Sequence, residues 1–163
     1  MSTALASAER DTLLRAIRIE ARNGAIYDAL ASVFRGFDES ITAVFLEMAE
    51  EERSHQARLE ARHEERFGAI SGGSEPEGPG EVVERADMED SEAFLFDSMT
   101  AEQALESGLR AELEARHFYE REAGRASDSG LKKVYGELAA FEGEHAARLQ
   151  AKLTQLRDGS ASR

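Results

Sequence analysis

The chain has 163 residues, a formal net charge of −13 and no cysteine. This length suits one domain with a substantial core, and the charge argues against nucleic-acid binding because phosphate would be repelled. The lack of cysteine excludes disulfides, thiolate metal sites, iron–sulfur clusters and thiol nucleophiles. Any bound metal must therefore have oxygen and nitrogen ligands.

The composition favours helix almost throughout, because alanine, glutamate, arginine and leucine are abundant and proline occurs only twice. We therefore expect an all-α fold, with one domain over residues 1–163. Residues 1–10 lack the apolar core of a signal peptide, and no stretch approaches the ~18 apolar residues that a membrane span needs. A cytoplasmic protein without a membrane partner is the resulting expectation.

Two long helices are predicted in the first half of the chain. The first covers roughly 7–35, and the second covers 39–67 after a cap at Asp38 or Ser40. Each has an inward apolar stripe with three- and four-residue steps. The stripes read Leu13, Ile17, Glu20, Gly24, Tyr27, Ala31 and Phe34 in the first helix, and Ile41, Phe45, Met48, Glu52, His55 and Leu59 in the second. The polar residues inside these stripes are candidate functional groups.

Residues 68–100 form one long connection between the two halves. Its Ser-Gly-Gly-Ser, Glu-Pro and Gly-Pro-Gly clusters cannot maintain a regular helix. A short helix over 92–99 could follow and pack its two phenylalanines against the bundle. Thr100-x-x-Gln103 then has the pattern of a capping box, which indicates the start of the next long helix.

The second half repeats the arrangement of the first, with helices predicted at roughly 101–126 and 130–157. Their inward residues are Leu105, Leu109, Glu112 and Tyr119, followed by Val134, Leu138, Glu142, His145, Leu149 and Leu153. The inward glutamate of each long helix falls near its midpoint, so all four can meet at one level. Short turns within the halves and a long connection between them predict a ferritin-like up-down-down-up four-helix bundle with a pseudo-two-fold axis.

One motif occurs twice, ninety residues apart: Glu52-x-x-His55-x-Ala-Arg-Leu and Glu142-x-x-His145-x-Ala-Arg-Leu. Positions three apart lie on one face of a helix, so each copy directs a carboxylate and an imidazole at the same point. This spacing is typical of metal ligands. Either copy alone would be weak evidence, but the duplication makes a metal site the better interpretation.

A second repeated pattern precedes each copy, as Glu20-x6-Tyr27 and Glu112-x6-Tyr119. Seven residues turn a helix by roughly 700°, close to two full turns, so the glutamate and the tyrosine share a face. Four carboxylates in an apolar interior could not stay ionised and unpaired. Two divalent cations would resolve this conflict.

The predicted ligand set contains two bridging glutamates, two glutamates that each hold one ion, and one histidine for each ion. The bridging pair is Glu52 and Glu142, and the other ligands are Glu20, Glu112, His55 and His145. Carboxylate and imidazole ligands suit iron or manganese, and zinc would also bind.

These motifs resemble those of the ferritin-like superfamily, and within it the rubrerythrin and bacterioferritin group, over nearly the whole chain. The resemblance implies a centre of two iron ions that reacts with dioxygen or hydrogen peroxide while Fe(II) is oxidised, in iron handling or oxidative-stress defence. It also implies that Tyr27 and Tyr119 form hydrogen bonds near the metal carboxylates and are candidate catalytic residues.

Two features depart from the rubrerythrin pattern. Full rubrerythrins add a cysteine-ligated rubredoxin domain, and this sequence contains no cysteine. Rubrerythrin peroxidase sites also carry a further glutamate three residues after the first one on the third helix, where this chain has Ala115. A symmetric centre of six ligands remains, which is closer to that of bacterioferritin.

Several alternatives stay open from the sequence. The chain could be a di-iron oxidase or oxygenase acting on an organic substrate, a protein that binds or delivers metal without turnover, or a purely structural bundle. The expected partners of the preferred hypothesis are Fe(II), dioxygen or peroxide and an external electron donor. A homo-oligomer is expected, with a dimer favoured.

Residues outside the inward stripes receive simpler interpretations. His63 and His117 are predicted at the surface or rim. Glu50, Glu51 and Glu144 are predicted to be solvated or to guide cations towards the site. The remaining predictions concern Asn23, which could contact the site or a neighbouring helix, and the core phenylalanines Phe34, Phe45, Phe118 and Phe141.

Overall fold

A computed structural model describes residues 3–70 and 99–161 of the chain. These residues form α1 (Thr3–Phe34), α2 (Glu39–Phe67), α4 (Ala101–Arg125) and α5 (Ser129–Ala161), with no strand among them. The expected all-α fold is confirmed. None of the helices in the described ranges has the length and hydropathy that a membrane span requires.

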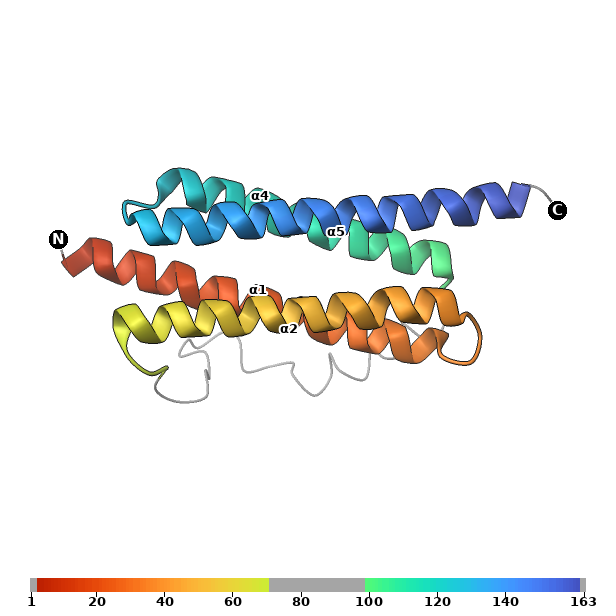
Figure 1. The fold of residues 1–163 in the computed structure, drawn as a ribbon, viewed down its shortest axis with the longest axis horizontal. Helices are drawn as coiled ribbons and strands as arrows, with labels where there is room; N and C mark the ends of the chain where they lie inside the picture. Colours follow the sequence, from red (N-terminus) through yellow and green to blue (C-terminus); the bar gives the residue numbers. More distant parts are fainter. Residues whose placement is uncertain (1–2, 71–98, 162–163) are drawn as a thin grey trace, which may run out of the picture.

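The helices pair into two antiparallel hairpins, α1 with α2 and α4 with α5 (Figure 1). The helices α2 and α4 run in the same direction although they follow each other in sequence, so the end of α2 and the start of α4 lie at opposite ends of the bundle (Figure 1). The up-down-down-up topology is therefore confirmed. The short helix predicted at 92–99 falls almost wholly outside the described residues.

The boundaries of α2 agree with the sequence prediction, whereas α1 begins earlier and α5 ends later than predicted. The alanine-rich stretch before Ser7 has high helix propensity, and no residue there stops the helix. At the other end, Leu156 packs against the core within the predicted range, and α5 continues past residue 157 to Ala161 through the exposed residues Asp158 and Gly159.

Side-chain caps determine where α2 and α4 begin. The Asp38 carboxylate accepts hydrogen bonds of 3.0 Å from the backbone N–H groups of Ser40 and Ile41. Thr100 and Gln103 form the predicted capping box, with distances of 3.2 and 2.9 Å. These contacts satisfy N–H groups that have no partner within a helix, and typically stabilise it by about 1 kcal/mol.

The core consists of two apolar clusters that flank a polar layer at the middle of the bundle. One contains Tyr27, Leu30, Ala31, Phe34, Ile41, Phe45, Met48, Ala49, Ala104, Leu105, Leu149 and Leu153. The other contains Leu13, Ala16, Ile17, Leu59, Ala115, Phe118, Tyr119, Leu131, Tyr135, Leu138 and Ala139. The polar layer is therefore separated from both ends of the bundle by close-packed side chains.

His63 corrects the sequence analysis, because it is buried and only 1 % exposed. It follows Leu59 by one helical turn, so it extends the inward face of α2 one turn beyond the predicted stripe. Neither ring nitrogen has a hydrogen-bond partner, and the ring packs 5.5 Å from that of Phe67. His117 is exposed as predicted, whereas Phe141, predicted in the core, is 39 % exposed.

We expect His63→Leu to stabilise the protein, because it replaces two buried nitrogens without hydrogen-bond partners by an apolar side chain. The expected gain in the free energy of unfolding is about 1–3 kcal/mol. Chemical denaturation of the metal-free protein would measure it. His117→Leu is the matched control at an exposed position and should change stability by less than ~0.5 kcal/mol. Destabilisation by His63→Leu would show that the imidazole has a favourable polar interaction.

Candidate metal centre

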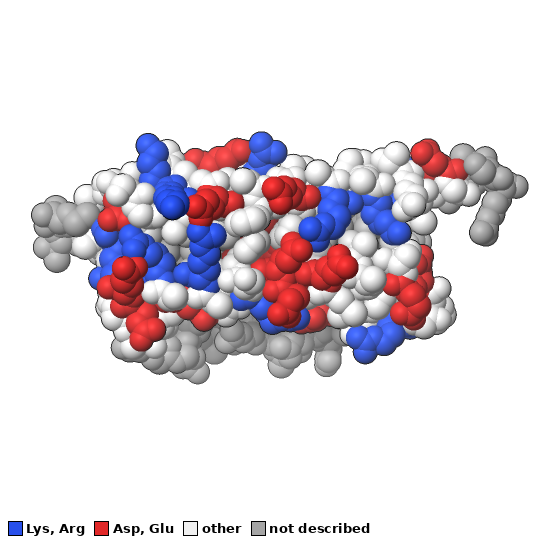
Figure 2. Space-filling view, in the orientation of Figure 1, with Lys and Arg blue, Asp and Glu red and all other residues white. Residues whose placement is uncertain are grey.

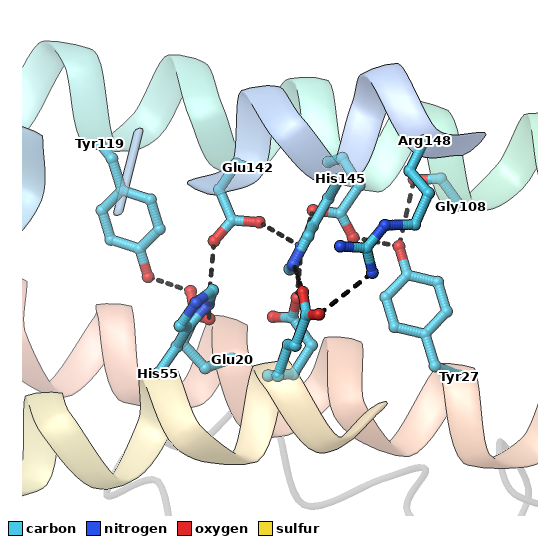
Figure 3. A network of polar contacts seen from close by, with 11 residues as sticks. Glu20, Tyr27, His55, Gly108, Tyr119, Glu142, His145 and Arg148 are labelled. Carbon is cyan, nitrogen blue, oxygen red and sulfur yellow. Dashed lines mark hydrogen bonds and ion pairs between the residues drawn. The ribbon is translucent and has the colours of Figure 1, made fainter. Parts of the chain in front are cut away.

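All six predicted ligands meet in the polar layer between the hairpins, several of them labelled in Figure 3. The four glutamates have no exposed surface, and the two histidines are 8 % and 1 % exposed. Their ligand atoms form two groups of four, each with all atoms within 4.8 Å of one another. The His55 position contains Glu20, Glu52, His55 and Glu142, and the His145 position contains Glu52, Glu112, Glu142 and His145. Glu52 and Glu142 belong to both.

Each helix contributes to this layer, and Gly24 lies where α1 contacts α2. A Cβ atom at Gly24 would lie 3.4 Å from Cβ of Glu52 and 3.7 Å from the carbonyl oxygen of Ala49. Both are ordinary van der Waals distances, so α1 and α2 pack in normal contact next to the motif on α2. Glu20 and Gly24 are four residues apart and therefore lie on the same face of α1.

Both histidines direct Nδ1 into the layer of carboxylates. In the His55 position, Nδ1 lies 3.2 Å from Oε2 of Glu20 and 3.5 Å from Oε1 of Glu142. In the His145 position, Nδ1 lies 3.0 Å from Oε1 of Glu52 and 3.4 Å from oxygens of Glu112 and Glu142. This second Nδ1 makes no hydrogen bond despite these short distances. It points at a space shared by three carboxylates.

The donor set fits a pair of divalent cations. Both oxygens of Glu52, both oxygens of Glu142 and one oxygen of Glu112 are buried without a hydrogen-bond partner. Buried carboxylate oxygens without partners are costly, and cations bound between them would remove that cost. Oxygen and imidazole ligands suit iron, manganese or zinc. The residues present therefore fit a di-metal carboxylate site.

Without metal, protons must compensate for the crowding of carboxylates. Burial raises the pKa of Glu52 to about 9 and that of Glu112 to about 8. Burial alone would lower the pKa of His55, but Glu142 and Glu20 raise it to about 10. The carboxylates around His145 likewise raise its pKa against the effect of burial, and the two histidines lower that of Glu142 to about 2. The metal-free site therefore holds several protons at neutral pH.

Each tyrosine of the repeated pattern bonds to the glutamate of the other hairpin. The hydroxyl of Tyr27 donates to Glu112 and lies 3.4 Å from the carbonyl oxygen of Gly108, and the hydroxyl of Tyr119 donates to Glu20. Burial and these carboxylates raise the pKa of both tyrosines well above the ordinary value. The two phenols therefore stay protonated and orient the carboxylates.

The comparisons with known proteins agree with this geometry. The sequence profile of the rubrerythrin family matches residues 11–153. The chain belongs to the rubrerythrin family. A search of curated proteins found no significant match.

Two solved structures share the fold of this rubrerythrin-family protein. One is a hypothetical protein from Pyrococcus furiosus, with 22 % identity, a TM-score of 0.66, and coverage of 91 % of this chain and 90 % of that one. The other is an uncharacterised conserved protein from Magnetospirillum magnetotacticum MS-1, with 22 % identity, a TM-score of 0.67, and coverage of 88 % and 92 %. At this level of sequence identity, the similarity to these two structures shows a shared fold and nothing more.

Two buried positions next to the ligands break the pseudo-two-fold symmetry of this family member. Asn23 follows Glu20 by three residues, and Ala115 follows Glu112 by the same step. Asn23 is 6 % exposed and its Nδ2 has no hydrogen-bond partner, whereas Ala115 packs in an apolar cluster. Position 115 therefore offers a methyl group where rubrerythrin peroxidase sites carry a further carboxylate.

The contact of Glu51 with the site was missed by the sequence analysis, which predicted a solvated or cation-guiding acid. Its carboxylate contacts Nε2 of His145 and accepts a 3.1 Å hydrogen bond from Nη1 of Arg148. Its side chain is 40 % exposed, so it links the buried histidine to the surface. Arg148 lies one turn after His145 in the repeated motif, so both side chains lie on one face of the helix. This spacing is the sequence signal that the two could share a carboxylate partner.

Gly108 allows Tyr27 to reach Glu112, and we expect Gly108→Ala to disturb this contact. The added Cβ would lie 3.1 Å from Leu149 and 3.2 Å from the ring of Tyr27. Overpacking of this kind costs about 1–3 kcal/mol. Gly136→Ala is the control, because nothing lies within 4 Å of its added Cβ; it should stabilise α5 by up to ~1 kcal/mol. Equal effects on the denaturation midpoint would contradict this role of Gly108.

The pKa shifts predict how the metal-free protein responds to pH. Glu52 and Glu112 bind protons in the folded state that they lose near 4.5 when unfolded, and His55 holds one up to about pH 10 rather than 6.5. Stability should therefore fall as pH rises from 6.5 to 8, by up to about 1.4 kcal/mol per pH unit for each group.

Thermal melting of chelator-treated protein across this pH range would measure the effect. Glu52→Gln should reduce the slope, because the amide does not titrate. The metal-loaded protein should behave in the opposite way, since bound cations replace the protons and binding tightens as protons leave. A metal-free melting temperature that rises with pH would show that these carboxylates are already ionised.

Proposed function

We propose that this protein holds two iron ions in the centre formed by the two hairpins and oxidises Fe(II) with dioxygen or hydrogen peroxide. The main support is the pair of four-residue groups that share Glu52 and Glu142. In this proposal Glu52 and Glu142 would help to hold both ions, while His55 with Glu20 and His145 with Glu112 would complete the two positions. Membership of the rubrerythrin family supports iron over the other metals that suit these ligands.

The bound pair of ions would supply the redox chemistry: two Fe(II) ions would give one electron each, and one molecule of hydrogen peroxide with two protons would become two molecules of water. The chain's own residues have three tasks. The two tyrosines hold Glu20 and Glu112 in position through hydrogen bonds. The apolar clusters on either side exclude water from the layer. The glutamates and histidines release their protons when cations bind.

The surface above the centre favours a cationic partner. Figure 2 shows acidic side chains gathered over the middle of the face formed by α2 and α5. Glu51 reaches this face and contacts His145. A concentration of negative charge attracts cations and raises their local concentration. This arrangement supports the delivery of Fe(II) to the buried ligands.

The shape of the surface gives less support to an organic substrate. Two surface hollows run along α2 and α5, one lined by Asp38, Ser40, Ile41, Lys152, Gln155, Leu156 and Gly159, and the other by Val44, Arg148, Ala151, Lys152 and Gln155. Neither is lined by any of the six ligands. These two hollows therefore give no support to an organic substrate bound beside the ligands.

We expect Glu52→Gln and Glu142→Gln to abolish most of the oxidation of Fe(II), because each of these glutamates would help to hold both ions. Metal content should fall below two ions per chain, and the rate of Fe(II)-dependent oxygen or peroxide consumption should fall by at least the roughly 10-fold to 100-fold that loss of an outer hydrogen-bond partner of a ligand costs. Elemental analysis and an oxygen electrode would measure the two quantities.

Glu114→Gln is the matched control, since Glu114 lies two residues from the ligand Glu112 on the same helix but is exposed. It should retain both metal content and rate. Wild-type rates in both bridging variants would rule out the proposal. Two tightly bound ions with slow oxidation would instead indicate a protein that stores or delivers metal.

A further inference from the structure

The two metal positions have equivalent ligands but different surroundings. In the repeated motif, the residue before the bridging glutamate is Glu51 in the first copy and Phe141 in the second. Because the hairpins pack face to face, each of these residues contacts the histidine of the other copy. One histidine therefore contacts a carboxylate, and the other contacts a phenyl ring.

At the His145 position, the outer nitrogen of the histidine contacts a carboxylate. Nδ1 of His145 faces the glutamates, while Nε2 contacts Oε2 of Glu51. The second oxygen of Glu51 accepts a 3.1 Å hydrogen bond from Arg148, which anchors the carboxylate. A carboxylate that accepts the outer N–H of a histidine fixes its orientation and strengthens it as a donor.

At the His55 position, the corresponding contact is apolar. The ring of Phe141 stacks on the imidazole of His55 with 5.2 Å between centroids and an interplanar angle of 30°. A phenyl ring cannot accept the outer N–H as a carboxylate does. The arginine that corresponds to Arg148 is Arg58, and it pairs with Glu137 instead. This histidine therefore receives neither the charge nor the anchoring found at the other position.

The tyrosines do not produce the same distinction. Each donates to the non-bridging glutamate of one position, Tyr27 to Glu112 and Tyr119 to Glu20. Both of these glutamates are fully buried. The two metal positions therefore differ in the carboxylate of Glu51, which lies beside the His145 position and adds a negative charge close to it.

We infer that the two positions bind metal with unequal affinity, that the His145 position fills first, and that Glu51 is the positioning residue that sets this order. The inference rests on the proposed di-metal function. It concerns affinity and order of binding, so it holds whichever oxidant the protein uses.

Anaerobic titration of the metal-free protein with Co(II) tests this inference, because the visible absorbance of Co(II) reports each coordination step. We expect two steps whose affinities differ by more than the fourfold statistical factor for identical sites. His145→Ala should remove the tighter step, and His55→Ala should remove the weaker one. The reverse assignment would overturn the inference.

Glu51→Gln should weaken the tighter step by about 10-fold to 100-fold, the range found when such outer hydrogen-bond partners are removed. The weaker step should not change. Glu50→Gln is the matched control, because it removes one negative charge from the adjacent position, which is 78 % exposed and pairs with Arg53. Melting of the metal-free variants would confirm that all of them are folded.

The outcomes separate this inference from the proposed function. Two equal steps, or a Glu51→Gln titration identical to that of Glu50→Gln, would overturn the inference and leave the di-metal site intact. No binding of Co(II) by the wild-type protein would overturn both. Two unequal steps of Co(II) binding that depend on Glu51, together with no oxidation of Fe(II), would support the inference about affinity and reject the proposed oxidation of Fe(II).

Discussion

The burial of four glutamates at one level inside an apolar bundle is the constraint on which the rest of this structure depends. Ionised carboxylates at such distances repel one another, and burial adds a large desolvation cost. The protein moderates this cost with two buried histidines, two tyrosine hydroxyls and bound protons. A site of this kind favours cations, because their binding removes the repulsion and releases the protons.

The sequence was sufficient to predict the helices and the six residues of the polar layer. The helical period decides which residues share a face, and the midpoint position of each glutamate decides that the four meet. Both properties are local, so they can be read from each helix separately. The predicted termini were less accurate, because fraying and packing at the ends depend on neighbouring helices. The end of α5 is an example, since the helix continues past its contact with the core at Leu156 to Ala161.

Contacts between helices were harder to predict. The crosswise pairing of each tyrosine with the other hairpin and the contact of Glu51 with His145 depend on how the helices are rotated and staggered. Periodicity within one helix carries no information about these quantities. The repeated motif also concealed the difference between Glu51 and Phe141, since the two copies match at the ligands and differ beside them.

The distribution of ligands between the hairpins has a mechanical consequence. The His55 position takes three side chains from the first hairpin and Glu142 from the second, and the His145 position takes three from the second and Glu52 from the first. An ion in either position would therefore join the two hairpins. In a chain without cysteine, the metal pair would serve as a reversible cross-link at the middle of the molecule, where it most resists separation of the halves.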